Sequence, residues 1–279
     1  MFSLILKKAM ETNKIYCESN LITMGKMPDC FVDLTVTSPP YDDLRTYNGY
    51  SFPFEDIAKE LFRVTKQGGI LVWVIADQTK NGSESGTSFR QALFFKEIGF
   101  NIHDTMIYKK KRIVPLTHNR YEQGFEYMFV FSKGKPKTFN PIMIDCIYAG
   151  TETWGKPSFH KTNSSGLVQV DKKKINDKKQ KDNVWEFLNA KDNVYKHPAP
   201  FPEQLANDHI ISWSNEGDLV YDCFMGSGTT AKMAKINNRN YIGSEISEEY
   251  CKIIETRIKE CGRLFLNSFE TELSNEAGT

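Results

Sequence analysis

The sequence predicts an α/β fold in which a mostly parallel sheet is covered by helices on both faces. Apolar runs of strand length alternate with segments of helical periodicity, starting with a strand at 31–37, a helix at 54–66 and a strand at 70–75. The run at 70–75 is apolar without interruption, which is typical of a strand buried on both faces. A chain of 279 residues is long enough for one substantial core and a small additional module.

The remaining elements follow from the same two periodicities. Pro39 and Pro40 end the first strand, and Gly68 and Gly69 end the first helix. From residue 132 to 196 the apolar periodicity decays, which indicates an inserted segment. Further elements are expected as a helix at 88–98, strands at 101–108 and 125–131, a helix at 203–213, a strand at 218–222, a helix at 229–237, a strand at 240–243 and a helix at 247–262.

Charge is distributed unevenly along the chain. The net charge is +1, but residues 133–196 contain 13 lysines and 7 acidic residues and therefore carry +6, so the rest of the chain carries −5. A basic insert on an acidic body indicates contact with a polyanion. A solvated loop is the alternative that charge alone leaves open.

Other features exclude several classes of protein. None of the apolar stretches approaches the roughly 20 residues that a membrane helix needs, and no signal peptide is recognised near the first residues. We therefore expect a cytoplasmic protein without a membrane partner. The six cysteines lack the C-x-x-C spacing of zinc and redox sites, so we expect reduced thiols and no metal site.

A glycine-rich turn follows the strand at 218–222 and opens a helix. Glycines permit a tight turn and the close approach of a ligand, and the helix N-terminus offers N–H groups to an anion. Glu245 ends the next strand, where a carboxylate can accept both hydroxyls of a ribose. The pattern also fits dinucleotide-binding enzymes, so a nicotinamide-dependent oxidoreductase is an alternative, although only about fifty residues follow the turn. The residues of the turn are Phe224, Gly226, Ser227, Gly228, Thr229 and Thr230.

A second candidate site lies at the end of the strand at 31–37, in the sequence Ser38-Pro39-Pro40-Tyr41. Open α/β sheets bind ligands at the carboxyl ends of their strands. The prolines are rigid, Ser38 offers a hydroxyl acceptor, and Pro39 offers a carbonyl acceptor. Tyr41 adds an aromatic face, so the group suits a planar base that carries an amino group. A proline-terminated strand with a surface tyrosine is the plainer alternative.

Together, these motifs resemble the DNA methyltransferases that modify exocyclic amino groups, specifically the group with permuted motif order. In that group the (D/N/S)-PP-(Y/F/W) motif precedes the F-x-G-x-G motif, and target recognition lies between them. This chain has Ser38–Tyr41 first, the lysine-rich insert next and Phe224–Gly228 near its end. The likeness covers residues from about 15 to 262.

The resemblance implies a Rossmann-like sheet of seven strands, mixed but mostly parallel, with helices on both faces. It implies S-adenosylmethionine as the cofactor and double-stranded DNA as the partner. Many members of the group form homodimers, and no residue pattern in this chain decides for or against one. Residues 1–132 and 197–267 would form the catalytic domain, 133–196 the target recognition insert and 268–279 a flexible tail.

The resemblance also implies roles for individual residues. Ser38, Pro39, Pro40 and Tyr41 would hold the base and catalyse the transfer. One departure concerns Ser19, which stands nine residues before Pro28 where the family often has Asp, so no cofactor contact is carried over there. The cofactor would be bound by Glu245 at its ribose, and otherwise by Asp222, Phe224, Gly226, Ser227, Gly228, Thr229, Thr230, His197, Pro198 and Pro202.

Ser38 also bears on the choice of base. Adenine-specific members of the family usually carry Asp or Asn at this position, whereas serine is commoner among members that methylate cytosine at N4. We therefore favour cytosine N4, with adenine N6 as the alternative. A base inside a duplex cannot reach such a pocket, so it would be flipped out and would stack against Tyr41. A non-catalytic nucleic-acid-binding module with the same fold is a further alternative.

Overall fold

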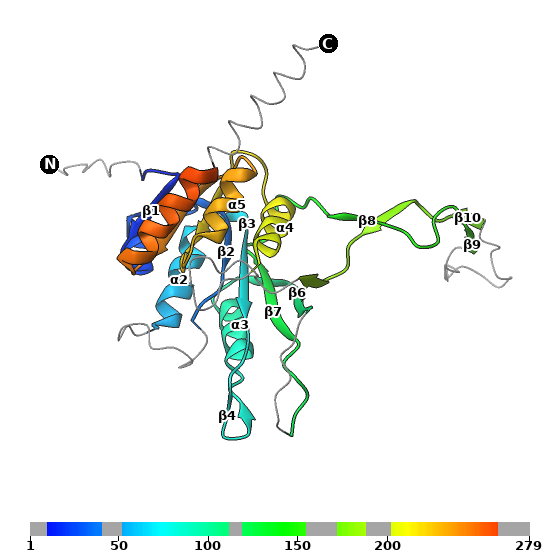
Figure 1. Cartoon of the computed structure of the whole chain (residues 1–279), viewed down its shortest axis with the longest axis horizontal. Helices are drawn as coiled ribbons and strands as arrows, with labels where there is room; N and C mark the ends of the chain where they lie inside the picture. The colour runs from blue at the N-terminus through cyan, green and yellow to red at the C-terminus, as the bar shows by residue number, and fades with distance from the viewer. Residues whose placement is uncertain (1–9, 41–51, 112–118, 155–171, 188–201, 262–279) are drawn as a thin grey trace, which may run out of the picture. The chain divides into compact units, whose positions relative to one another are not determined.

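The computed structural model describes residues 10–40, 52–111, 119–154, 172–187 and 202–261 (Figure 1). The chain forms two compact units. The larger unit comprises residues 1–140 and 183–279, and the smaller unit comprises residues 141–182. The Ser38 motif and the glycine-rich turn both belong to the larger unit.

One sheet organises the larger unit. Within the described residues it has eight strands, and only β7 runs antiparallel to its neighbours. The predicted fold class is confirmed. The sheet has one strand more than the expected seven, because β12 pairs in parallel with β6 at the edge. In spatial order the strands are β1 (Lys14–Cys17), β14 (Asn240–Glu245), β13 (Leu219–Asp222), β2 (Val32–Thr37), β3 (Thr65–Ile75), β7 (Phe125–Ser132), β6 (Asn101–Lys110) and β12 (Val184–Phe187).

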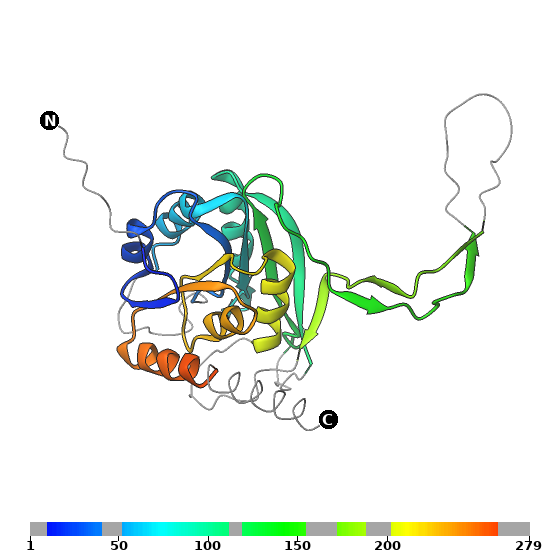
Figure 2. The same ribbon diagram turned by 90° about the horizontal axis from the view of Figure 1, so that it is seen from above.

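Helices cover both faces of this sheet (Figure 2). One face carries three helices that pack in succession, and the other carries two helices together with helical residues 248–261. Among the described residues, no helix has the length and apolar character needed to cross a membrane. The first face holds α1 (Asn20–Lys26), α2 (Phe54–Val64) and α3 (Thr87–Glu97), and the second holds α4 (Glu203–Trp213) and α5 (Thr229–Ile236).

The core between the sheet and the first group of helices is rich in aromatic side chains. Trp73 of β3 is fully buried, with its ring centroid 5.1 Å from that of Phe95 and 6.1 Å from that of Phe54. Its indole N–H donates to the Gln91 side chain over 2.8 Å, so the one polar atom of this ring is satisfied. These contacts join α2 and α3 to the centre of the sheet.

The smaller unit contains two short antiparallel ribbons among its described residues. β8 (Met143–Asp145) pairs with β11 (Lys178–Gln180), and β9 (Glu152–Trp154) pairs with β10 (Lys172–Lys174). The unit is narrower than the expected insert at 133–196, because β12 joins the large sheet and residues 133–140 belong to the larger unit. Two-stranded ribbons bury little apolar surface and have little intrinsic stability in water.

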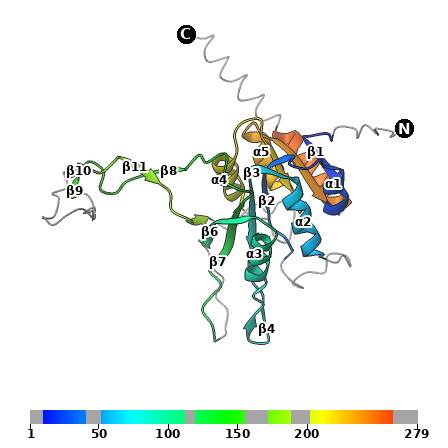
Figure 3. The same ribbon diagram turned by 180° about the vertical axis from the view of Figure 1, so that it is seen from behind.

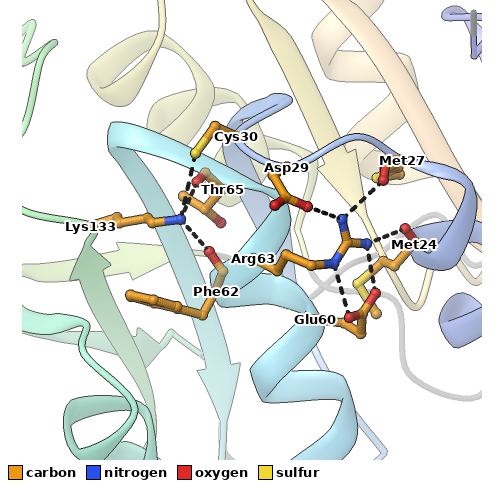
Figure 4. A network of polar contacts seen from close by, with 9 residues as sticks. All are labelled: Met24, Met27, Asp29, Cys30, Glu60, Phe62, Arg63, Thr65 and Lys133. Carbon is orange, nitrogen blue, oxygen red and sulfur yellow. Dashed lines mark hydrogen bonds and ion pairs between the residues drawn. The ribbon is translucent and has the colours of Figure 1, made fainter.

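A network of hydrogen bonds and ion pairs around Arg63 lies at the amino edge of the sheet, where α1 and α2 end (Figure 4). Arg63 of α2 donates to the main-chain carbonyls of Met24 over 2.6 Å and Met27 over 3.0 Å, at the end of α1. It also forms ion pairs with Glu60 and Asp29, both at 2.7 Å. The Glu60 hydrogen bond is the main cause that raises the pKa of Arg63, so the guanidinium stays charged. The residue thereby ties the end of one helix to the end of the other.

Lys133 caps α2 in the same region (Figure 4). Its ammonium donates to the carbonyls of Phe62 over 2.7 Å and Thr65 over 3.0 Å, and it lies 4.5 Å from the centre of the Phe62 ring. The last carbonyls of a helix lack helical partners and favour a cation. Arg63 and Lys133 therefore stabilise helix ends at the start of β2 and β3, opposite the carboxyl ends of these strands.

We expect Arg63→Ala to lower the free energy of unfolding by about 2–3 kcal/mol, because it removes several charge-assisted hydrogen bonds at once. Urea titration followed by circular dichroism measures the change. Lys59→Ala is the matched control, since Lys59 of the same helix forms an exposed pair with Glu55 at 3.6 Å, worth less than about 0.5 kcal/mol. Equal stability of the two variants would contradict the role of Arg63.

Candidate active site

The sheet reverses its winding direction between β2 and β13. From β2 the chain passes through α2 to β3 on one side, and from β13 it passes through α5 to β14 on the other. Open α/β sheets bind ligands at the carboxyl ends of the strands at such a switch point. The Ser38 motif follows β2 and the glycine turn follows β13, so the fold brings both motifs to this place.

A buried hydrogen bond joins the two motifs. The Thr37 hydroxyl at the end of β2 donates to the Asp222 carboxylate at the end of β13 over 2.6 Å. The Phe224 N–H also donates to Asp222, over 3.0 Å. In addition, the Thr230 hydroxyl donates to the carbonyl of Val36 over 3.2 Å. The turn after β13 is thus attached to the last two residues before Ser38.

Asp222 is almost completely buried, and this burial raises the pKa of its carboxyl to about 6. Hydrogen bonds from Thr37 and the Phe224 N–H oppose the shift. Above this pKa the carboxylate is ionised and accepts from these donors. The structure therefore places Asp222 between the two motifs, where it holds Thr37 and the glycine turn together.

Left-handed backbone conformations shape the glycine turn. Gly226 has φ 53° and Gly228 has φ 85°. A Cβ on Gly228 would also lie 2.8 Å from Cγ2 of Ile254, so a larger residue would clash with the Ile254 side chain. The turn leads directly into α5, whose first residues, Thr229 and Thr230, are buried.

Glu245 ends β14 and faces the glycine turn. One carboxylate oxygen accepts the Gly226 N–H over 2.8 Å, and the other accepts the Ser247 N–H over 2.9 Å. Burial raises the pKa of Glu245, and hydrogen bonds from these amides oppose the shift. Each carboxylate oxygen has a second lone pair, so the group can also accept two hydroxyls of a ligand. This arrangement fits a ribose.

Charged side chains near the start of α4 also fix the position of the glycine turn. Arg257, on the last described helix, donates to the carbonyl of Ser227 over 2.8 Å. Arg257 and Lys232 both form ion pairs with Glu203. Glu203 directly follows Pro202, which is buried at the start of α4. These side chains, which the sequence analysis missed, link the predicted residue Pro202 to the glycine turn.

The residues of the Ser38 motif stand at the carboxyl edge of the sheet. Ser38, Pro39 and Pro40 come directly after β2, where Pro39 is buried and the other two are partly exposed. Their neighbours along the edge are the glycine turn and Glu245, as the pairing of β2, β13 and β14 requires. Three further predicted residues, Tyr41, His197 and Pro198, lie outside the described residues.

Phe224 opens the glycine turn with a half-buried aromatic ring. Its centroid lies 5.7 Å from that of Phe52 and 6.2 Å from that of Trp73, both in edge-on contact. Within the described part of the chain, no group of three or more His, Cys, Asp or Glu side chains could hold a metal ion. The turn, the Glu245 carboxylate and the Phe224 ring together fit a nucleoside ligand.

Comparison with known proteins identifies the family. The family described as DNA methylase matches residues 32–256. Orphan methyltransferase M.BamHII of Bacillus amyloliquefaciens is 55% identical over 245 residues, which cover 83% of this chain and 90% of that protein. Type II methyltransferase M.BglII of Bacillus subtilis is 27% identical, over 86% of this chain and 67% of that protein.

Solved structures show the same fold. PvuII DNA methyltransferase (cytosine-N4-specific) matches with a TM-score of 0.65 at 18% identity, over 92% of this chain and 94% of that chain. The M1.HpyAVI–SAM complex matches with a TM-score of 0.59 at 22% identity, over 88% of this chain and 98% of that chain. From the family match and the relative at 55% identity, this chain belongs to the DNA methylase family and is an S-adenosylmethionine-dependent DNA methyltransferase that acts on an exocyclic amino group.

Proposed function

We propose that this protein methylates cytosine at N4 within a specific sequence of double-stranded DNA. The proposal rests on Ser38, which holds the first position of the motif and directly follows the tethered Thr37. Serine there is commoner among relatives that modify cytosine, and the PvuII enzyme of matching fold is described as cytosine-N4-specific. Adenine N6 is the second candidate, because DNA adenine methyltransferase YhdJ of Escherichia coli (strain K12) is 29% identical over 253 residues.

The base would be held by the Ser38 motif. An exocyclic amine is a poor nucleophile, because its lone pair is delocalised into the ring of the base. The Ser38 hydroxyl and the Pro39 carbonyl would accept its N–H groups and so draw the lone pair out of the ring plane. Acceptors already in place for the developing positive charge lower the barrier further. Tyr41 would stack on the flipped base.

The cofactor would be held by the glycine turn and by Glu245. S-adenosylmethionine supplies an electrophilic methyl group when it is bound. Glu245 would accept its ribose hydroxyls, and the turn from Phe224 to Thr230 would surround its amino-acid end. Asp222 would act by position, since its buried carboxylate holds the turn to Thr37. Three further contacts, from His197, Pro198 and Pro202, follow from the family resemblance.

Target recognition is proposed for the smaller unit, residues 141–182, which lies within the expected insert at 133–196. β10 consists of Lys172–Lys174, and β11 contains Lys178 and Lys179. Lysines that neutralise DNA phosphates release counterions and so supply affinity. The larger unit, residues 1–140 and 183–279, would then form the catalytic domain, and this basic segment would contact the DNA.

Product analysis tests the proposed function. We expect the full-length protein to transfer labelled methyl groups to unmethylated genomic DNA, with N4-methylcytosine as the labelled nucleoside found by digestion and mass spectrometry. Ser38→Ala controls for contaminating methyltransferases and should lower the rate by about 10²–10³-fold. N6-methyladenine as the sole product would overturn the cytosine assignment. Absence of labelled DNA with the wild-type protein would overturn the function itself.

Thr37→Val should lower the methylation rate at saturating substrates by about 10²-fold, because a misplacement near 1 Å has an effect of this size. The affinity for S-adenosylmethionine should change much less, since Glu245 remains in place. Single-turnover kinetics and calorimetry measure the two quantities. Thr37→Ser keeps the hydroxyl and should restore most of the rate. An equal loss of rate in both variants would show that the hydrogen bond to Asp222 is not responsible.

Glu245→Ala should weaken the binding of S-adenosylmethionine by about 1.5–3 kcal/mol, the scale of charge-assisted hydrogen bonds. Isothermal titration calorimetry measures the affinity, and thermal unfolding verifies that the variant folds. Glu249→Ala is the matched control, because Glu249 is exposed on the next helix, and it should bind as the wild type does. Unchanged affinity in Glu245→Ala would remove this residue from the cofactor site.

A further inference from the structure

A small hairpin projects from the carboxyl edge of the sheet. β4 (Thr79–Lys80) and β5 (Ser83–Glu84) are antiparallel and are joined by Asn81 and Gly82. Both joining residues have positive φ, 52° and 77°, as in a tight two-residue hairpin turn. All six residues are exposed to solvent. Figures 1 and 3 show the hairpin extending beyond α3.

The hairpin is anchored at both ends. At its base, the Asp77 carboxylate accepts the Ser85 hydroxyl over 2.9 Å and the Ser88 N–H over 3.0 Å. At its tip, the guanidinium of Arg120, in the connection between β6 and β7, donates to the carbonyl of Gly82. A two-stranded hairpin alone has little intrinsic stability, so these anchors hold it in position.

The hairpin emerges beside the proposed base pocket. It follows β3, which is parallel and adjacent to β2, and neighbouring strands lie about 4.8 Å apart. Ser38 therefore lies one strand away from the root of the hairpin. Ile75 at the end of β3 pairs with Tyr127 near the start of β7, so the approach to β7 lies at the same edge. Tyr121 is fully exposed on this approach.

We infer that the hairpin at Thr79–Glu84, together with Arg120 and Tyr121, forms a second DNA contact beside the target base. The inference rests on the proposed function. A base flipped into the Ser38 pocket stays attached to its backbone, so the duplex must lie against this edge of the sheet. Segments that project from the edge then face the duplex. The contact is separate from the lysine-rich insert, because the hairpin belongs to the larger unit.

The chemistry of these residues suits a nucleic acid. Arginine and lysine side chains are among the groups that most often contact DNA phosphates. Protein–DNA interfaces are polar and hydrated, whereas protein–protein interfaces need an apolar core that this hairpin lacks. DNA is therefore the partner that we assign, rather than a second copy of the chain. The polar members are Thr79, Lys80, Asn81, Ser83 and Arg120, and the acidic residue of the hairpin is Glu84.

Methylation kinetics with unmethylated plasmid DNA test the second contact. Lys80→Ala and Tyr121→Ala should each raise the KM for DNA by about three- to tenfold, with the rate at saturating DNA and the affinity for S-adenosylmethionine unchanged. The log–log salt slope of DNA binding should fall by about 1 in Lys80→Ala. Lys96→Ala is the matched control and should behave as the wild type, because exposed Lys96 lies in the last turn of α3, at the opposite edge of the sheet.

Three results would separate the possibilities. Wild-type KM and salt slope in both Lys80→Ala and Tyr121→Ala would overturn the second contact, while methylation by the wild-type protein would leave the proposed function standing. Failure of the wild-type protein to methylate DNA would overturn the proposed function itself. A changed sedimentation mass without a change in KM would assign the hairpin to contact between copies of the chain, and this would also overturn the inference.

Discussion

The hydrogen bond between Thr37 and Asp222 is the contact on which the arrangement of the site depends. It joins residues 185 positions apart in the sequence, at the place where the sheet reverses its winding direction. Prolines fix the local backbone of the Ser38 motif, and glycines fix that of the glycine turn. Neither motif can by itself set the distance between the two. The sheet and this hydrogen bond set that distance. Transfer between two bound groups requires it to be correct to within about 1 Å.

The side chains at the two edges of the sheet have different roles. At the amino edge, Arg63 and Lys133 satisfy the carbonyls at the ends of α1 and α2, and their contacts are within the protein. At the carboxyl edge, Glu245 and Arg257 hold the backbone of the glycine turn in the proposed cofactor site. This division follows from the parallel strands, whose carboxyl ends all meet at one edge. The hairpin at 79–84 projects from the same edge (Figure 1).

Local chemistry could be recognised from the sequence, whereas tertiary partners could not. Apolar runs predicted β2, β3 and β13. The prolines after β2 and the glycines after β13 predicted the two motifs of the site. β1 and β12 were missed, because they are the short edge strands of the sheet and are defined mainly by pairing with β14 and β6. Arg257 and Glu203 were missed because a charged residue on a helix carries no motif. Thr37 lay beside a recognised motif, but its role required Asp222 as a neighbour.

The hydrogen bond between Thr37 and Asp222 serves the function of the protein more than its stability. Burial raises the pKa of this carboxyl to about 6, so the folded chain binds its proton more tightly than the unfolded chain does. The stability that the group contributes is therefore complete below the unfolded pKa near 3.9 and is lost as the pH rises through 6. At neutral pH the ionised carboxylate therefore makes the fold less stable than it is at low pH. A polar residue without charge would avoid this cost. Only an acceptor at this point can hold the Thr37 hydroxyl and the Phe224 N–H together, and an ionised acceptor holds them most strongly.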